Sequence, residues 1–415
     1  MLNNPEMEET VIKTPGVKRP IFPDMVEVNP SEATPLQKRN VPGYFLTIWV
    51  GIWVNLHMAL LALRAYKSIK KTRTALRGLQ EFKEKAFAKN GRRKFSVKNR
   101  QYWFGLYVPP FPSKNFDRFI LTELNRYVPH STPINAHQQV NFAITTKCPM
   151  RCEHCFEWDN LNLRETFSLA HLQEITQKLQ QDGLGHISLS GGEPMVRFED
   201  MVELIRSGEK STEWWILTSG FNLTEAKAKR LKDAGATGVV VSLDHHDAEI
   251  NNKFRGHKDA FGHAIHAAKA TVNARLTLAI SVCVTRENAN REFLTKHTSL
   301  CESLGAHFIQ WLEPRAEGHY RDKEVMLLPD QITVMEELFV AFNHDPKNNH
   351  FPPVMYHGYH QRRVGCMSGG KFSFYVDALG MVHSCPFCHS NDFKITDWLE
   401  MPKIGRKEIT ACTSF

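Results

Sequence analysis

Three cysteines within the run 148–155 are the strongest chemical signal in the sequence. Cys148, Cys152 and Cys155 follow the spacing C-x3-C-x2-C, and Phe156 comes directly after the last of them. Thiolates are the usual ligands of a four-iron cluster, so three of them can hold three irons and leave the fourth open. The alternative is a structural zinc site, which needs a fourth protein ligand nearby. The two residues between the second and third cysteines are poorly placed to supply one.

A glycine turn about 35 residues further along carries a second group suited to ligand binding. The run Ser190-Gly191-Gly192-Glu193 follows the stretch 186–189, which predicts a strand that ends in this turn. Glycines allow the backbone to approach a ligand closely, and a carboxylate at a strand end can accept a hydrogen bond from an ammonium group. A glycine turn after a strand usually has no function of its own. This one is informative because of its distance from the cysteines.

Taken together, the two motifs resemble the signatures of the radical S-adenosylmethionine (SAM) enzymes. In that family three cysteines hold a [4Fe-4S] cluster whose open iron binds SAM, and the reduced cluster cleaves SAM to a radical that abstracts hydrogen. The resemblance implies that Cys148, Cys152 and Cys155 are the cluster ligands and that Glu193 binds the amino group of SAM. It also implies that the cofactor site includes Phe156, Ser190, Gly191 and Gly192.

Short β-branched runs alternate with longer helical patterns from about residue 138 onward. The expected strands are 140–145, 186–190, 214–218, 238–243, 277–284 and 306–311, and helices are expected at 168–182, 224–234 and 289–304. Such alternation indicates parallel βαβ units and an α/β fold. Six units resemble the partial (β/α)6 barrel of the radical SAM family, and catalytic groups gather at the carboxyl ends of barrel strands.

Weaker SAM contacts are expected near the ends of the later strands. Thr218 ends the third expected strand and Ser242 lies at the end of the fourth, where the family has polar residues that touch SAM. Arg255 and Arg286 could each pair with the carboxylate of SAM through a bidentate contact. A single arginine on a loop is more often a solvated surface charge, so both positions need support from geometry.

The C-terminal part holds a second group of cysteines. Cys366 is followed by thirteen residues, Gly380, four residues and Cys385, and then by Cys388 and Cys412. This arrangement resembles the opening of the SPASM extension, which binds auxiliary iron-sulfur clusters, in a shortened "twitch" form with one [4Fe-4S] cluster. A β-hairpin at 374–386 is expected to carry ligands at its base. Four thiolates close such a site, three leave an iron open, and four-cysteine zinc is the alternative.

An uncharged run of twenty residues at 44–63 is long enough to cross a bilayer as a helix. More cations follow the run than precede it, so the positive-inside rule places its C-terminal side in the cytoplasm. An amphipathic helix on the membrane surface is the alternative. Residues 64–100 hold fourteen Lys and Arg against two Glu. The excess of positive charge in this tract is larger than the net charge of +8 of the whole chain, so the remainder of the chain is slightly acidic. We interpret this tract as a topology signal and an anionic-lipid contact, with no nucleic acid as partner.

Five parts are expected along the chain. They are a disordered arm (1–42), a membrane helix (43–66), a basic and aromatic linker (67–137), a radical SAM barrel (138–345) and an auxiliary-cluster region (346–415). The aromatic segment 102–112 is expected to lie against the membrane, to cap the barrel or to form a packed linker. Nine cysteines without a secretory cleavage pattern indicate a reducing compartment, not a disulfide framework.

The sequence therefore predicts a single-pass membrane enzyme with its catalytic domain in the cytoplasm. The resemblance implies a SAM-dependent maturase that modifies a ribosomal peptide or protein and takes electrons from a donor such as flavodoxin or ferredoxin. Modification of a membrane lipid or small-molecule precursor is the alternative. A non-enzymatic zinc-binding membrane scaffold is a third interpretation, and the glycine turn at 190–193 speaks against it.

Overall fold

The computed structural model describes residues 42–86, 94–130, 137–366, 369–370, 372–390, 393–402 and 408–409. Most of the expected arm 1–42, and Cys412, lie outside these residues. The centre of the fold is a ten-stranded sheet in the order β12-β11-β10-β3-β4-β5-β6-β7-β8-β9. Strands β3 to β9 run parallel in chain order, and β10 runs parallel to β3 on its other side.

The expected strands are confirmed as the middle of this sheet. They are β3 (Gln139–Ala143), β4 (His186–Ser190), β5 (Glu213–Thr218), β6 (Gly238–Ser242), β7 (Thr277–Cys283) and β8 (Phe308–Leu312). Each begins and ends close to its predicted bounds, because continuous apolar runs mark strands that are buried on both faces. The α/β class and the parallel sheet are therefore confirmed.

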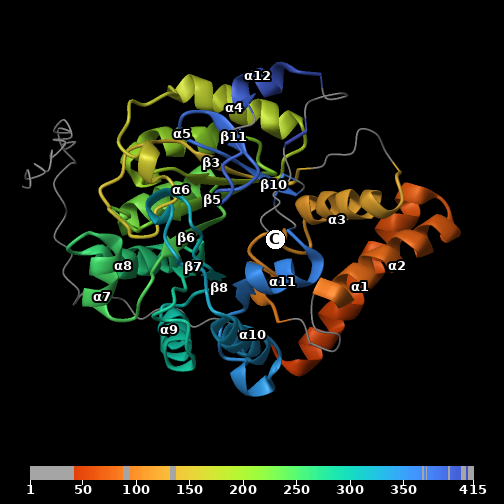
Figure 1. Cartoon of the computed structure of the whole chain (residues 1–415). Helices are drawn as coiled ribbons and strands as arrows, with labels where there is room; N and C mark the ends of the chain where they lie inside the picture. Colours follow the sequence, from red (N-terminus) through yellow and green to blue (C-terminus); the bar gives the residue numbers. More distant parts are fainter. Residues whose placement is uncertain are drawn as a thin grey trace, which may run out of the picture.

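Helices cover the outer face of this sheet (Figure 1). They are α4 (Leu169–Gln181), α5 (Phe198–Ser207), α6 (Glu225–Ala234), α7 (Ala248–Arg255), α8 (Ala260–Asn273), α9 (Arg291–Ser303) and α10 (Pro329–His344). Side chains alternate between the two faces of a strand. In β6, Val239 and Val241 belong to the large core shared with the helices, whereas Val240 faces the inner side.

The aromatic segment caps this inner face. Strands β1 (Ser96–Lys98) and β2 (Gln101–Trp103) form a small antiparallel hairpin, and the chain then turns inward. Trp103 and Leu106 are buried against the inner-face residues Trp215, Val240 and Phe308. Of the three expected placements for residues 102–112, the structure therefore shows a cap over the sheet.

Three helices stand beside the sheet: α1 (Tyr44–Tyr66), α2 (Ile69–Ala86) and α3 (Lys114–Tyr127). The interpretation of 67–137 as a linker was incomplete, because most of it is folded. Thr72, Ala75 and Leu79 are buried at helical spacing and make α2 an amphipathic helix. The Tyr66 hydroxyl donates to the Leu124 and Val128 carbonyls at 3.0 and 2.7 Å, which fixes the end of α1 on α3.

The expected hairpin at 374–386 is present, but it continues the main sheet. Strand β10 (Ser373–Val376) pairs with β11 (Met381–His383), and β12 (Phe393–Lys394) follows at the edge. Because β10 also pairs with β3, the C-terminal hairpin is part of the main sheet and not of a separate unit. The remaining elements are β9 (Val354–Tyr356), α11 (His357–Val364), α12 (Ile395–Glu400), η2 (Trp158–Asn160), η3 (Pro194–Arg197), η4 (Gly318–Tyr320) and η5 (Pro346–Asn348).

Candidate active site

A cavity of about 310 Å³ lies on the inner face of the sheet, at the carboxyl ends of its parallel strands. Cys148, Cys152 and Cys155 line it, as do the glycine turn at 190–193 and the side chains of Thr218 and Ser242. Carboxyl ends of parallel strands are where ligands bind in folds of this kind. The structure therefore brings the two sequence motifs to one place.

The glycine turn is hydrogen-bonded directly to the start of the cysteine loop. The Gly192 amide donates to the Thr145 carbonyl at 2.8 Å, and the Glu193 amide donates to the Lys147 carbonyl at 2.7 Å. A Cβ atom on Gly191 would collide with the Thr145 backbone, and one on Gly192 with the Lys147 backbone. Glycine is needed at both positions because two backbone segments pass within contact distance.

Glu193 is buried and accepts four hydrogen bonds through its carboxylate. One oxygen accepts from the Met195 amide at 3.0 Å and the Thr218 hydroxyl at 2.6 Å. The other accepts from the Ser219 amide at 2.8 Å and the Ser219 hydroxyl at 2.5 Å. Burial raises the pKa of Glu193, although these donors oppose the shift. The carboxylate is thus held rigidly at the cavity wall, where Thr218 and Ser219 position it.

Arg255 lies between an acidic residue and one of the cysteines. Its Nε donates to Asp244 Oδ2 at 2.7 Å, and its Nη1 lies 3.6 Å from Cys152 Sγ. Asp244 Oδ1 accepts from the Cys283 amide at 2.8 Å. Burial lowers the pKa of Arg255, but Asp244 and Cys152 outweigh this effect and raise it. A permanent positive charge therefore faces the cysteine loop.

The end of α7 supports the cysteine loop. The Arg151 amide donates to the Arg255 carbonyl at 3.1 Å, and the Glu153 amide donates to the Phe254 carbonyl at 2.9 Å. Gly256 has a φ of +60°, and a Cβ atom there would collide with the Arg151 backbone. The end of α7 therefore acts on the loop through its backbone as well as through the Arg255 guanidinium.

A second support of the cysteine loop comes from η4. The His319 amide donates to the Cys155 carbonyl at 2.9 Å, and His319 Nδ1 lies 3.1 Å from the Cys152 carbonyl oxygen. The His319 ring stacks on Trp158 with centroids 3.8 Å apart and planes 6° from parallel. Gly318 has a φ of +57°, and a Cβ atom there would collide with the Cys155 and Phe156 carbonyls. Sequence reasoning missed this support, since Gly-His in a loop carries no distinctive signal.

Residues 142–294, which contain these motifs, match the family model of the radical SAM superfamily. This part of the chain is a radical SAM domain. SuiB from Streptococcus suis, in its structure with the precursor peptide SuiA, matches with a TM-score of 0.54 at 15% identity, covering 70% of this chain and 71% of SuiB. SuiB bound to S-adenosylmethionine matches with a TM-score of 0.52 at 14% identity, covering 72% and 74% of the two chains. This similarity shows a shared fold.

The cavity wall suits the [4Fe-4S] cluster and SAM that the radical SAM family implies. All three cysteines line the cavity. Burial raises the pKa of Cys148 and Cys152, and that of Cys155 to about 12, so binding of iron must release protons. Among the described residues, no three His, Cys, Asp or Glu side chains converge as a single metal ion requires. A cubane is larger than one ion, so its three thiolate ligands need not converge on a single point.

The second cysteine group, which lies outside the radical SAM domain, faces the same cavity. Cys366 and Cys385 line it, and Cys388 lies beside Cys385, to whose carbonyl its amide donates at 3.2 Å. Phe156, also in the wall, contacts Tyr375 of β10 and Phe387 edge to face, with centroids 5.8 and 5.7 Å away. The cavity therefore extends from the family's cysteine motif to the C-terminal hairpin.

Among the candidate residues that the structure describes, Arg286 is the one that lies away from the cavity and from the two cysteine groups. It does not line the cavity, and its Nε donates to the Met326 carbonyl at 2.7 Å. Arg255, in contrast, is buried in the cavity wall. The two arginines looked equivalent in the sequence, and only their positions in the fold separate them.

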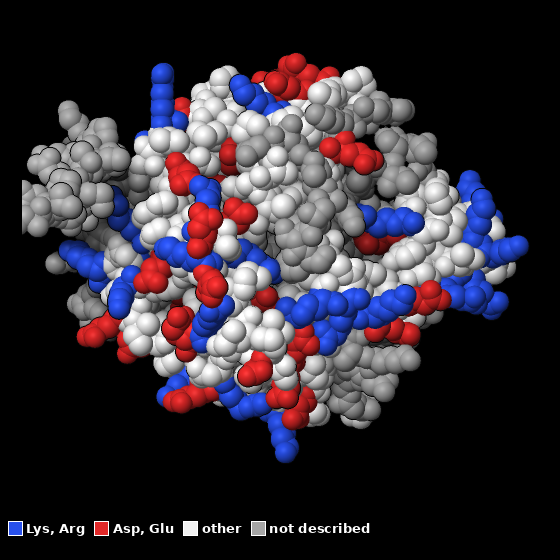
Figure 2. All heavy atoms as spheres, viewed as in Figure 1, with Lys and Arg blue, Asp and Glu red and all other residues white. Residues whose placement is uncertain are grey.

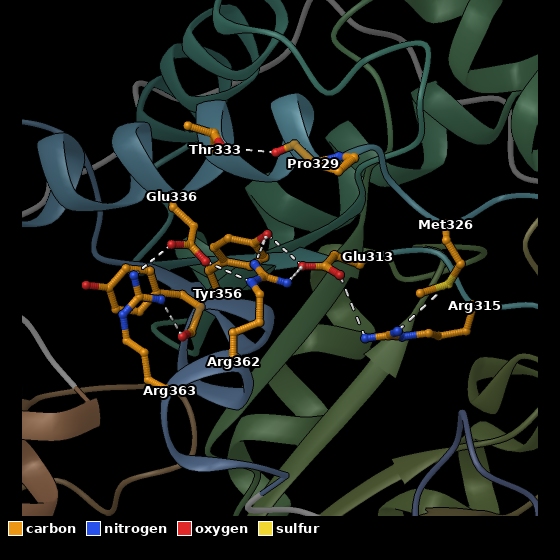
Figure 3. A network of polar contacts seen from close by, with 10 residues as sticks. Glu313, Arg315, Met326, Pro329, Thr333, Glu336, Tyr356, Arg362 and Arg363 are labelled. Carbon is orange, nitrogen blue, oxygen red and sulfur yellow. Dashed lines mark hydrogen bonds and ion pairs between the residues drawn. The ribbon is translucent and has the colours of Figure 1, made fainter. Parts of the chain in front are cut away.

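A charged network anchors α11, which forms another part of the wall (Figure 3). Arg362 donates to Glu313 at 2.7 Å and to Glu336 at 2.8 Å, and Arg363 donates to Glu336 at 2.7 Å. The Tyr356 hydroxyl also donates to Glu313 at 2.6 Å. This network joins α11 to α10 and to the segment that follows β8, so the wall formed by His357 to Gln361 is fixed in place.

Proposed function

We propose that this chain modifies a peptide by radical SAM chemistry in a partial (β/α)6 barrel, with one auxiliary [4Fe-4S] cluster. The observation that carries the proposal is that the SAM-motif cysteines and two SPASM-like cysteines, Cys366 and Cys385, line one cavity. A substrate in that cavity would lie between the two groups. When bound, the first cluster supplies the electron that cleaves SAM to the hydrogen-abstracting radical.

The residues of the chain have separate tasks in this proposal. Glu193, positioned by Thr218 and Ser219, would accept a hydrogen bond from the SAM ammonium in place of one hydroxyl donor. Arg255 would hold positive charge beside Cys152 and stabilise the anionic cluster. The backbone contacts from Gly256 and His319 keep the loop rigid, which holds the reacting bond in place and excludes water.

The peptide assignment is supported by fold similarity to SuiB, a protein bound to its precursor peptide in the matching structure. A lipid substrate is the second candidate, because α1 exposes a row of apolar side chains beside the catalytic part. We place the catalytic part in the cytoplasm, where SAM and a donor such as flavodoxin or ferredoxin are available.

Anaerobic reconstitution with iron and sulfide tests the chemistry. After reduction with dithionite in the presence of SAM, we expect 5′-deoxyadenosine to form. Cys152→Ala should abolish this product, whereas Cys301→Ala removes a buried thiol that does not line the cavity and should not. Bound zinc without product would contradict the proposal.

A hydrogen-transfer experiment tests the substrate class. The reconstituted enzyme would be incubated with SAM and with separate peptide and lipid fractions from deuterium-labelled cells. Deuterium in 5′-deoxyadenosine from the peptide fraction alone is expected. Deuterium from the lipid fraction alone would replace the peptide proposal with the lipid one.

A further inference from the structure

One face of α1 is apolar and exposed along its whole length. The exposed side chains recur every three or four residues and form a stripe of Phe45, Ile48, Trp49, Ile52, Leu56, Leu60 and Leu63. The helix is long and apolar enough to cross a membrane, and only 17% of its apolar 18-residue stretch is buried within the protein. An apolar stripe of this size on a helix requires a partner surface.

The opposite face of α1 is packed against α2 and α3. Met58, Ala62 and Tyr66 are buried with residues of α2 and α3. Near the middle of the helix, His57 Nε2 lies 2.6 Å from Asp117 Oδ1 of α3. Crossing a bilayer would carry Asp117 and the packed part of α2 into hydrocarbon, where charged side chains are strongly disfavoured. This packing argues against the spanning orientation expected from the sequence.

A groove of about 500 Å³ lies between α1 and α2 and has both apolar and cationic walls. Met58, Ile69 and Leu76 contribute its apolar part, and Arg73 and Arg77 contribute positive charge. Further cations of α2, among them Lys70 and Lys71, are exposed. Blue side chains gather at the right-hand side of Figure 2, where Figure 1 shows α2. Cations next to apolar side chains match the phosphate and acyl parts of an anionic lipid.

We infer that α1 and α2 form a membrane-surface anchor, in which the α1 stripe is buried in one leaflet and the groove binds an anionic lipid. The lipid surface is favoured over a second copy of this chain, because two copies would bring their α2 cations together. The anchor also reaches the catalytic cavity: His360 of α11 hydrogen-bonds the Ala86 carbonyl at the end of α2 through Nδ1 at 2.8 Å. Helix α11 lines the cavity, so the site is held at a fixed position relative to the leaflet.

Vesicle binding by the full-length protein tests this inference independently of SAM chemistry. We expect binding to phosphatidylglycerol vesicles and at least about tenfold weaker binding to phosphatidylcholine vesicles. The double variant Ile52→Glu/Leu56→Glu should reduce binding by at least about tenfold. Its matched control is Ile250→Glu, because Ile250 on α7 is 52% exposed and Ile52 is 56% exposed. SAM cleavage should be unchanged in both, which confirms folding.

The cationic part has its own pair of variants. Arg73→Gln/Arg77→Gln should weaken binding to phosphatidylglycerol vesicles by about tenfold and leave binding to phosphatidylcholine vesicles unchanged. Lys210→Gln/Lys229→Gln removes two exposed cations elsewhere and should have no such effect. Equal losses from the two pairs would show only a general charge effect and would overturn the assignment of the groove.

Extraction from membranes separates lying on a leaflet from crossing it. Alkaline carbonate should release the protein from membranes, because a helix on the membrane surface is bound less strongly than a helix that spans the bilayer. Retention after carbonate would restore the spanning orientation and overturn the inference. The inference would also fail if Ile52→Glu/Leu56→Glu dissociated a dimer without changing vesicle binding, since the stripe would then be a protein interface.

Discussion

Arg255 and Cys152 lie 3.6 Å apart from guanidinium nitrogen to sulfur, although 103 residues separate them in the chain. The arginine reaches the thiol from the last turn of α7, and its other side is held by Asp244. A fixed positive charge next to an iron ligand stabilises the reduced, more negative state of a cluster and therefore raises the reduction potential of the cluster. The surroundings of the cysteine loop therefore include a charged residue that no part of the cysteine motif indicates.

Replacing Arg255 by Met should lower SAM cleavage by at least about tenfold, because Asp244 would be left buried without its partner and Cys152 without its charge. Arg286→Met is the matched control, since Arg286 was an equal candidate in the sequence but lies outside the cavity. The measurement is 5′-deoxyadenosine formed per reconstituted cluster, with the cluster potential determined beside it. Equal losses in the two variants would contradict the role of Arg255.

Gly318→Ala should destabilise the protein by about 1–3 kcal/mol and reduce cluster content. Its added methyl would meet the carbonyls of Cys155 and Phe156 at a positive φ. Gly235→Ala provides the control, because Gly235 also has a positive φ but has only a side-chain methyl of Ile205 nearby. Thermal unfolding and iron content should show both variants destabilised and only Gly318→Ala depleted of iron.

Cys385→Ala should lower the iron content from about eight to about four per chain and leave SAM cleavage in the absence of substrate intact. Cys152→Ala should lose the same amount of iron together with SAM cleavage. The physical reason is that the two cysteines belong to different groups in one cavity. An unchanged iron content in Cys385→Ala would remove the auxiliary cluster from the proposal.

The stability of the protein should depend on pH through Lys98. Burial, together with nearby Lys232, lowers the pKa of Lys98 from 10.5 to about 7. Between these values the unfolded chain binds more protons than the folded one, so the free energy of unfolding rises with pH by up to about 1.4 kcal/mol per unit. Lys98→Met removes this contribution.

Denaturant unfolding at about pH 7 and about pH 9 checks the pH prediction. The stability advantage of Lys98→Met over the unaltered protein should shrink as the pH rises. An advantage that stays constant would mean that Lys98 keeps its proton in the folded state.

The sequence predicted those features of the fold and of the site that local sequence patterns determine. Strand β4 was placed at 186–190 without error, because its apolar residues and the following Gly191 mark both ends. The cysteine loop and the glycine turn were identified as partners from their joint resemblance to the radical SAM signatures. Helix α3 was missed because it lies in a tract dominated by the flanking charges and aromatics.

Contacts between distant segments could not be read from the chain. Nothing around Gly318 or His319 indicates that they meet the Cys155 carbonyl, since that contact exists only after η4 packs on the loop. The pairing of β10 with β3 was likewise beyond prediction, because edge pairing depends on which neighbouring strand leaves its backbone groups available. Arg255 and Arg286 differ for the same reason.

The pairing of β10 with β3 has a consequence for how the protein is made. Ser373 pairs with Gln139 and Val376 with Phe142, so the first catalytic strand awaits a partner that the ribosome delivers over two hundred residues later. Until then the backbone groups along one side of β3 are open to association with other nascent chains. Completion of the sheet is thereby tied to synthesis of the segment that carries Cys366 and Cys385, so the strand that leads into the cysteine loop lacks one neighbour until that segment has left the ribosome.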